Sequence, residues 1–328
     1  MKTSRSIDVL FVLLPDTLVL DWAGPAEAFR IANRLRMAAG HAAPFNLRFI
    51  GPRPAATGSV GAVIANIEAL PQQLKDPAWL VLCGMPSTKV HAEAAASRAA
   101  VQWLRGLQPG SNGLHLITIC SGALLAAQAG LLRGHTATTH HQHLEDLRAA
   151  EPDCEVMTNR VFVQDGAVSS SAGVTTGIDL ALHLVSQECG PACAARVAQT
   201  MVVALRRGPN DPEHSPLLAY RNHMHPALHR VQDAIAEHPK QNWTVPRMAA
   251  IAHTSPRHLT RLFLSHTAIT PLQYLRRMRL GVAELSLRSG HSVTRAAELA
   301  GFGSDTQLRR AWRGFGRTGT PSEALSEN

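Results

Sequence analysis

The first part of the chain alternates short apolar runs with longer patterns of helical period. Ile7–Leu14 reads IDVLFVLL, which is apolar apart from Asp8 and contains β-branched residues, a pattern typical of a strand buried on both faces of a parallel sheet. The further expected strands are Phe45–Ile50, Ala62–Ile67, Trp79–Cys83, Leu114–Ile119, Val161–Gln164 and Ala167–Ser170. Of these, Ala62–Ile67 has the weakest strand pattern. The expected helices are Pro25–Ala39, Ala92–Leu107, Ser121–Ala129, Gly177–Glu188 and Pro191–Leu205, with a loop before the first of them. This alternation predicts an α/β sandwich of the flavodoxin-like type around a mostly parallel sheet, with a hairpin formed by its last two strands.

The texture changes at residue 206. Residues 206–225 are crowded with Pro, Gly, Asn and Asp, which favours a linker. Pro226–Glu237 then has the pattern of a helix that opens a second domain. The pattern therefore predicts a domain over residues 1–205, a linker over 206–225 and an all-α domain over 226–328.

The second domain contains the same helix–turn–helix pattern twice. Met248–Phe263 and Ala296–Trp312 each comprise a short Ala-rich helix, a turn and a second helix, and the second turn is one residue longer. Ser255 and Ser304 are placed to cap the second helix of each copy, and Pro256 suits the first helical position. Leu272–Leu287 between the copies predicts one connecting helix of roughly 24 Å. Two second helices held by it could lie about one DNA turn, ~34 Å, apart.

The second helix of each copy has an apolar stripe and a polar free face. Leu259, Leu262 and Phe263 fall on one stripe, and Leu308, Ala311 and Trp312 on the other. Arg and Gln side chains at the start of a helix can bond base edges in the major groove of DNA. The candidate base-contacting residues are Arg257, His258, Thr260, Arg261, Asp305, Thr306, Gln307 and Arg310.

The net charge of +8 is confined to this region. Residues 221–328 hold 15 Lys and Arg against 7 Asp and Glu, whereas the remaining 220 residues hold 17 of each. A basic module joined to a neutral domain is typical of nucleic-acid binding.

The duplicated region closely resembles the AraC-type DNA-binding domain. The resemblance rests on SPRHLTRLF, on TPLQYLRRMRL and on the GFGS…LRRAW pattern of Gly301–Trp312. Two departures are Ala268, where the family usually has Gly, and one extra residue between Phe315 and Pro321. The resemblance implies a transcription regulator that binds double-stranded DNA. The competing interpretation is an ordinary helical bundle with a basic solvated face.

The sequence also indicates where the protein works. It predicts no signal peptide and no membrane span, because the first apolar run is short and is broken by Pro15 and Asp16. Five cysteines, an odd number, argue against a disulfide framework and favour a reducing cytoplasm. Cys189 and Cys193 lack a second ligand pair and are interpreted as buried thiols. The histidines of His140–His143 and of His223–His225 lack partners at metal-ligand spacing, so we expect no metal and no cofactor.

A second motif lies in the first domain. In Ile117–Leu132, an apolar strand ends at Cys120, Gly122 gives conformational freedom, and a helix starts at once. This is the geometry of a nucleophile elbow, which lifts a side chain above the carboxyl edge of the sheet. The start of the helix favours a thiolate or a bound anion there.

The segments Leu20–Phe29, Cys120–His140 and Ser170–Val185 resemble the DJ-1/PfpI superfamily, including its isocyanide hydratases and the branch fused to AraC domains. The resemblance implies that, as in the hydratases, the Cys at the elbow works with an Asp in the loop after the first strand. By position these residues are Cys120 and Asp21. Glu27 is a further candidate carboxylate. PfpI peptidases have His where this chain has Ser121, so a peptidase is not favoured.

Three interpretations of the elbow stay open. Cys120, Asp21 and Glu27 could form a working catalytic set, as in a hydratase-like enzyme; a stress-linked chaperone or deglycase of the DJ-1 kind is a separate alternative for the function of the whole protein. The elbow could be kept only for packing. The favoured interpretation is a sensor without turnover, in which Asp21, Glu27, Cys120 and Ser121 hold a small effector. By resemblance the effector is a small nitrogen compound such as an amino acid, amine or betaine, and the regulator is a homodimer.

Overall fold

The computed structural model describes residues 6–86, 95–203, 207–209, 220, 223–288, 290–315 and 320–323. The chain forms two compact units, Met1–Glu213 and His214–Asn328, and each is described by itself. Much of the predicted linker, residues 206–225, lies outside the described residues, so its boundaries stay a prediction. Within the described part of the chain, no helix has the length and apolar character needed to cross a membrane.

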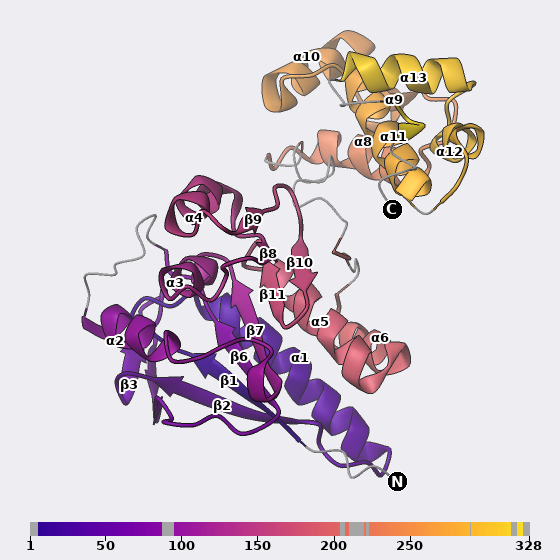
Figure 1. The fold of residues 1–328 in the computed structure, drawn as a ribbon. Coiled ribbons are helices and arrows are strands. Elements are labelled where there is room, and N and C mark those ends of the chain that lie inside the picture. Colours follow the sequence, from indigo (N-terminus) through magenta and orange to yellow (C-terminus); the bar gives the residue numbers. More distant parts are fainter. Residues whose placement is uncertain are drawn as a thin grey trace. The chain divides into compact units, whose positions relative to one another are not determined.

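The N-terminal unit is built on a seven-stranded sheet with the order β10-β11-β7-β6-β1-β2-β5 (Figure 1). The strands are β1 Ile7–Val12, β2 Phe45–Gly51, β5 Glu68–Ala69, β6 Ala78–Leu82, β7 Leu114–Ile119, β10 Phe162–Asp165 and β11 Val168–Ser171. All neighbours are parallel except β10 and β11, which form the antiparallel hairpin that the sequence predicts.

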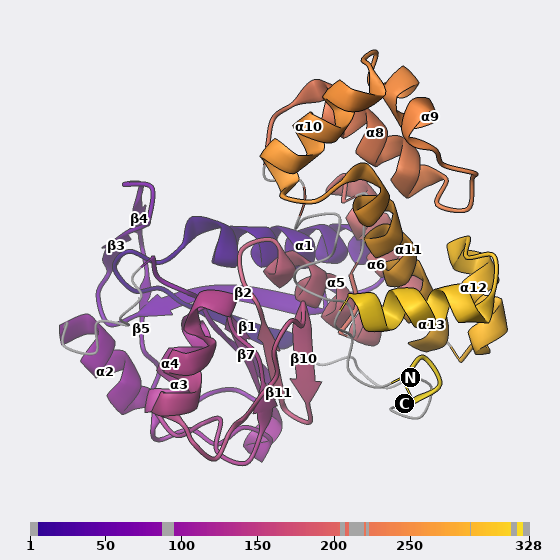
Figure 2. The same ribbon diagram turned by 90° about the horizontal axis from the view of Figure 1, so that it is seen from above.

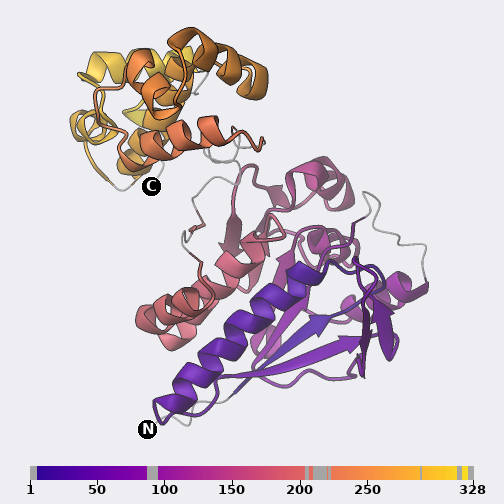
Figure 3. The ribbon, with the colours of Figure 1, turned by 180° about the vertical axis from the view of Figure 1, so that it is seen from behind.

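Helices cover both faces of this sheet. On one face lie α1 (Val19–Ala38), α5 (Thr176–Cys189) and α6 (Pro191–Thr200), of which α1 runs along the sheet in Figure 3. On the other lie α2 (Ala95–Leu104), α3 (Gly122–Gln128) and α4 (Leu144–Ala150). From Val9 onward, alternate residues of β1 enter the two cores, and this is why its run is apolar except for Asp8. The predicted α/β sandwich is confirmed.

The largest difference from the sequence prediction is the start of α1. The helix begins at Val19, not at Pro25, so the segment expected to be a loop is helical. A proline inside a helix removes one backbone hydrogen bond. Here tertiary packing offsets that loss, because a Cβ added to Gly24 would lie 2.8 Å from Ile178 of α5.

Smaller differences concern short elements. The weak run Ala62–Ile67 yields only β4 (Val63–Ala65), which pairs with β3 (Ala55–Thr57) outside the main sheet. The helix expected from Ala92 is seen from Ala95, and residues 92–94 lie outside the described residues. The helix α6 ends at Thr200 instead of Leu205. Helix α4 and the two-residue strands β8 (Thr136–Ala137) and β9 (Glu155–Val156) were not expected from the sequence pattern.

The C-terminal unit is helical, as predicted. Its described helices are α8 Pro226–Glu237, α9 Val245–Ile251, α10 Pro256–Thr267, α11 Pro271–Arg288, α12 Val293–Ala300 and α13 Asp305–Gly314. Figure 2 shows α11 running from the α8–α10 group to α12 and α13. Tyr274, Leu275 and Met278 of α11 join the core of the first group, and Leu280, Ala283 and Leu287 join that of the second. One helix therefore positions both helix-turn-helix copies.

Candidate functional sites

The two helix-turn-helix copies share the same turn geometry. His253 and Gly301, which occupy equivalent places, both have left-handed backbones, with φ 52° and φ 80°. In each copy the next residue closes the turn, because Thr254 N–H donates to Ala249 O at 3.0 Å and Phe302 N–H to Ala297 O at 2.9 Å. Both are Schellman-type helix ends. The duplication in the sequence is therefore a duplication of backbone geometry.

The second helix of each copy starts with the predicted cap. The Ser255 hydroxyl accepts a hydrogen bond from His258 N–H at 3.2 Å, and that of Ser304 accepts one from Gln307 N–H at 3.3 Å. The central residues of the predicted stripes, Leu308 and Trp312 among them, are buried. Because the apolar stripes are buried, the polar faces of α10 and α13 are exposed to solvent.

The candidate base-contacting side chains differ in how far they are held in place. Arg257, Arg261, Thr306, Gln307 and Arg310 are exposed, whereas His258, Thr260 and Asp305 are half-buried. Arg261 donates to His258 Nδ1 at 2.8 Å. The Thr260 hydroxyl donates to Pro256 O, Asp305 accepts from Thr294, and Gln307 accepts from Gly303 N–H. Most of the set is therefore already oriented by neighbours within the protein.

Contacts between the copies fix their relative position. Arg279 on α11 donates from Nε to Pro239 O and from Nη2 to Gln241 O, both at 2.9 Å. A Cβ added to Gly301 would lie 2.7 Å from Lys240 Cα, so the turn of the second copy packs against the loop before the first. These contacts join the two helix-turn-helix copies into one packed unit.

In the N-terminal unit, Cys120 occupies a nucleophile elbow at the end of β7. Its backbone is left-handed, with φ 55°, which is uncommon for a residue with a side chain. The Cys120 N–H donates to Ser171 O at 3.1 Å, and its carbonyl accepts from the Thr139 hydroxyl at 2.7 Å. A Cβ added to Gly122 would lie 2.2 Å from Leu82 O, which explains the glycine after the elbow. The predicted strand-to-helix geometry is present.

The structure brings Asp21 and Ser121 to this elbow. The two oxygens of Asp21 accept hydrogen bonds from Gly84 N–H at 3.0 Å and from Val174 N–H at 3.1 Å. The Ser121 hydroxyl accepts from Met85 N–H at 2.9 Å and donates to Met85 O. We call Cys120, Asp21 and Ser121, with the backbone of Gly84 and Val174, the elbow site.

Burial controls the chemistry of the elbow site. Asp21 is fully buried, and burial raises its pKa to about 6, against the opposing effect of its two backbone hydrogen bonds. The neighbouring Cys83 thiol is also buried, and burial and the nearby Asp21 raise its pKa well above the usual value. Cys120 itself is 5% exposed. A carboxyl group with a pKa of this kind can exchange a proton near neutral pH.

Glu27 is not part of the elbow site. Its side chain is about half exposed and forms an ion pair with Arg30 at 2.6 Å on the outer side of α1. The hydrogen bond from Arg30 lowers the pKa of Glu27. The structure therefore separates Glu27 from Cys120 and Asp21, with which the sequence analysis grouped it.

Other site residues were missed by the sequence analysis. Gly84 and Val174 supply the two donors to Asp21, and Thr139 holds the elbow carbonyl. Each lies next to or within a motif noted in the sequence: Gly84 follows the WLVLC strand, and Val174 lies in SSAGVTTG. Position within a motif is a weak signal, because the donors are backbone groups and carry no side-chain signature.

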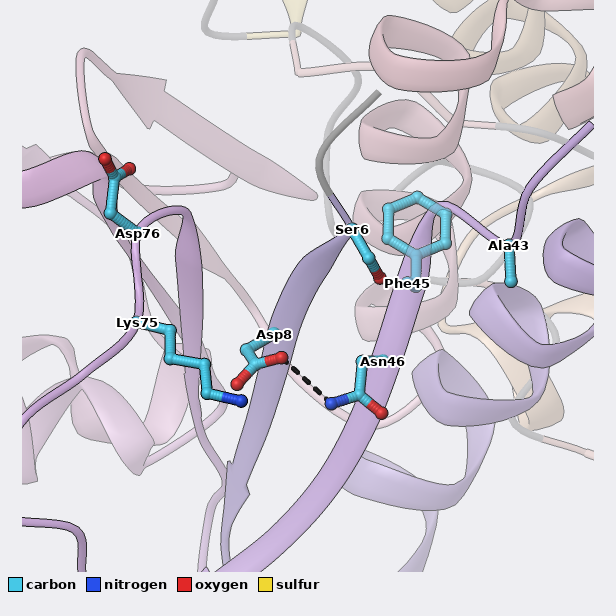
Figure 4. A pocket seen from close by; sticks show the side chains of 7 residues that line it. All are labelled: Ser6, Asp8, Ala43, Phe45, Asn46, Lys75 and Asp76. Atoms are coloured by element: carbon cyan, nitrogen blue, oxygen red, sulfur yellow. Dashed lines mark hydrogen bonds between the residues drawn. The ribbon is translucent and has the colours of Figure 1, made fainter. Parts of the chain in front are cut away.

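A separate hollow of about 590 Å³ lies at the opposite, amino edge of the sheet (Figure 4). Asp8, Asn46, Lys75 and Asp76 contribute its polar lining, and Asn46 Nδ2 donates to Asp8 Oδ1 at 2.9 Å. None of the elbow-site residues lines it. This hollow is therefore unrelated to the chemistry of Cys120.

The described histidines and the remaining cysteines were compared with the requirements of a metal site. Among the described residues, no group of three or more His, Cys, Asp or Glu side chains could hold a metal ion. His143 is buried and bonded to Asp146 at 3.1 Å, and His140 accepts from Gln142 N–H. Cys189 and Cys193 are free, half-buried thiols.

Fold and sites together define the class of protein. The basic helical unit carries two helix-turn-helix copies, each with a capped second helix whose polar face is exposed, and it is joined to an α/β domain with a nucleophile elbow. This combination is typical of a DNA-binding transcription regulator. Comparison with known proteins agrees. Residues 248–323 match the family described as "Helix-turn-helix domain", and residues 72–187 match the "DJ-1/PfpI family".

Relatives match along nearly the whole chain. The HTH-type transcriptional regulator CdhR of Pseudomonas aeruginosa is 30% identical, over 94% of this chain and 88% of its own length. The HTH-type transcriptional regulator GlxA of Rhizobium meliloti is 26% identical, over 94% and 93%. Isonitrile hydratase of Pseudomonas putida is 35% identical over 101 residues, which are 30% of this chain and 40% of the enzyme.

A crystal structure of an AraC family transcriptional regulator from Pseudomonas putida shares the fold of 60% of this chain, over 99% of its own length, with a TM-score of 0.51 and 20% identity. The chain belongs to the AraC-type helix-turn-helix transcription regulators that carry an N-terminal DJ-1/PfpI domain. It is a sequence-specific DNA-binding regulator.

Proposed function

We propose that the elbow site is where this regulator senses a small effector. The observation that carries the proposal is Asp21, a fully buried carboxylate that bridges Gly84 and Val174 beside Cys120. Such a group is costly to bury in charged form. In a regulator, a site of this kind is useful if a ligand changes its charge balance or its shape.

The same observation suggests the class of effector. Burial and two backbone hydrogen bonds, with no cationic side chain among the contributors, set the pKa of Asp21. An ammonium group brought near this carboxylate would favour its charged form. This fits the small amines, amino acids or betaines that the family resemblance implies.

An enzymatic role is the second candidate. It is favoured by the partial similarity to isonitrile hydratase and by the thiol of Cys120 at the elbow. Against it stands the similarity to transcription regulators along the full chain. We propose that the protein has no turnover, and that Asp21, Cys120 and Ser121 bind the effector without chemistry.

The test is a thermal-shift screen of small nitrogen compounds on the full chain, since a ligand that binds only the folded form raises its melting temperature. Asp21→Asn should abolish the shift caused by a compound found in this way. Glu27→Gln, on the same helix but exposed, is the matched control and should leave the shift intact. Loss of turnover of an isocyanide on Cys120→Ala would instead establish the enzyme.

For DNA, we propose that the eight candidate residues of α10 and α13 contact bases: Arg257, His258, Thr260, Arg261, Asp305, Thr306, Gln307 and Arg310. Their polar faces and caps support this assignment. A mobility shift with DNA upstream of the protein's own gene, against random competitor, tests sequence preference. Affinity should fall steeply with salt, because Lys and Arg displace counterions from phosphates. We further propose that the regulator acts as a homodimer in the cytoplasm.

A further inference from the structure

Arg207 is tied to the N-terminal unit where the chain enters the predicted linker. Its backbone N–H donates to Asp179 Oδ1 at 3.1 Å, and Nε and Nη2 donate to Asp179 Oδ2 at 2.9 and 2.6 Å. Nη2 also donates to Thr175 Oγ1 at 3.0 Å. The Asp179 side chain is 3% exposed and that of Arg207 is 17% exposed. Charge-assisted bonds to a buried carboxylate are among the stronger ones in proteins.

This contact fixes the main chain at position 207 as well as the side chain, because the backbone N–H is one of the donors. Removing the arginine would leave a buried carboxylate without this cation, which is strongly unfavourable. Position 207 is therefore an anchor for the chain that leads toward the DNA-binding unit.

The anchor lies against the same turn that holds the elbow site. We call Gly173–Thr176 the site turn. On one side, Val174 N–H donates to Asp21, and a Cβ added to Gly173 would lie 2.8 Å from Cys120 Sγ. On the other side, Thr175 accepts from Arg207, and the Thr176 hydroxyl closes the turn on Gly173 N–H at 2.7 Å. Within these four consecutive residues, Gly173 and Val174 contact the elbow site and Thr175 contacts the anchor.

The site turn is strained. Val174 has a left-handed backbone, with φ 50°, which is an outlier for a β-branched residue. Strained conformations persist only where surrounding contacts impose them. Here the contacts are Asp21 at one end and the Arg207–Asp179–Thr175 cluster at the other.

We propose that Arg207 is the anchor through which the site turn passes the state of the elbow site to the linker. A ligand that draws Asp21 away from Val174 shifts the turn, and the shifted turn releases Arg207. The proposal rests on the proposed effector site. Coupling of this kind is reciprocal, so release of Arg207 must also loosen the bond between Val174 and Asp21.

Amide hydrogen exchange in the full chain, without effector or DNA, tests this reciprocity. In Arg207→Gln, the amides at positions 207 and 174 should both exchange about tenfold faster or more than in the wild type. Asp21→Asn should likewise speed exchange at position 207. The matched control is Arg48→Gln, which breaks another arginine pair with a buried carboxylate, that of Asp8. It should leave both amides within about twofold of the wild type.

If the amide of position 207 exchanges faster in Arg207→Gln but that of Val174 does not, Arg207 holds only its own segment of the chain and the proposal is wrong. If position 207 itself is unchanged, the ion pair does not hold the anchor, and the proposal is equally wrong. Should Arg207→Gln not fold, Arg207→Lys keeps the charge but loses the two guanidinium donors to Asp179 Oδ2, and the same two amides decide. Because neither effector nor DNA is used, a negative result leaves the sensing and DNA-binding assignments standing, and their failure leaves this result unaffected.

Discussion

Gly173 lies against Cys120 so closely that a Cβ added at position 173 would come within 2.6 Å of the Cys120 Cβ and 2.8 Å of its Sγ. A Cβ added to Gly84 would likewise lie 2.8 Å from the Cys120 Cβ. Backbone without side chains therefore walls the thiol on two sides. In the proposed sensing role, an effector that contacted the thiol would therefore press on the site turn.

The first prediction concerns this contact. Gly173→Ala should destabilise the N-terminal unit by roughly 3 kcal/mol or more, because it combines left-handed backbone strain with overpacking against Cys120. The matched control is Gly166→Ala, at a glycine that also has positive φ, 56°, but has open space around its Cβ direction. It should cost only the backbone part, about 1–2 kcal/mol. Equal losses in chemical denaturation of the two variants would show that the contact with Cys120 does not matter.

The second prediction is a pH dependence from Asp21. The pKa of this carboxyl is raised to about 6 in the folded state from an ordinary 3.8. The folded state therefore holds the proton more tightly than the unfolded state. The resulting stabilisation is complete below pH 3.8 and is lost as the pH rises through 6.

Asp21→Asn removes this titration. Between pH 4.5 and 7.5 the wild type should lose about 2 kcal/mol of stability relative to the variant. Urea unfolding of both proteins at the two pH values measures the difference, and all other titrating groups cancel in the comparison. A difference that is independent of pH would mean that the Asp21 carboxyl is ionised throughout.

The strand pattern was predictable because the central strands of the main sheet, such as β1, β6 and β7, are buried on both faces, so apolar residues predominate in them. β7, Leu114–Ile119, has the predicted bounds. The start of α1 was not predictable, because Pro25 is a reliable helix-start signal unless tertiary contacts offset its lost hydrogen bond. Those contacts come from Ile178, far along the chain.

The candidate sites divide in the same way. The second helices of the two helix-turn-helix copies, α10 and α13, were predictable because caps such as Ser255 and apolar stripes are local sequence patterns. Asp21 was grouped with Cys120 by resemblance, and the structure places it there. Glu27 was not separable from Asp21 in sequence, since only the helix geometry of α1 turns it toward Arg30. The donors to Asp21 are backbone amides, one of them on Val174, 153 residues away, and leave no side-chain signal.

The third prediction follows from the departure at Ala268. This residue ends α10 in the left-handed region, with φ 57°, where the family usually has Gly. Ala268→Gly should stabilise the C-terminal unit by about 1 kcal/mol, because glycine adopts this conformation without steric cost. Ala250→Gly, at an exposed position inside α9, should instead destabilise it by about 0.5–1 kcal/mol. Thermal unfolding of both variants is the measurement, and the same sign of shift in both would contradict the argument.

The fourth prediction concerns Arg261, which the neighbouring His258 orients. A guanidinium can only donate hydrogen bonds, so Nδ1 of His258 must accept in this pair, which places the ring proton on Nε2. An arginine side chain that is already held in place loses less conformational entropy when it binds a guanine edge than a freely moving one does. Arg261→Ala should therefore cost roughly 1–3 kcal/mol of specific binding and relax the preference at one base pair.

The matched control for this prediction is Arg313→Ala, an exposed arginine in the last turn of α13, away from the capped start of that helix. If Arg313 contacts DNA, it contacts phosphate, so its loss should weaken binding to all sequences alike and reduce the salt dependence. Binding titrations with the preferred duplex and with single-base variants, at two salt concentrations, separate the two effects. An Arg261→Ala protein that weakens every duplex by the same factor would assign Arg261 to the phosphate backbone and would remove α10 as the helix that reads sequence.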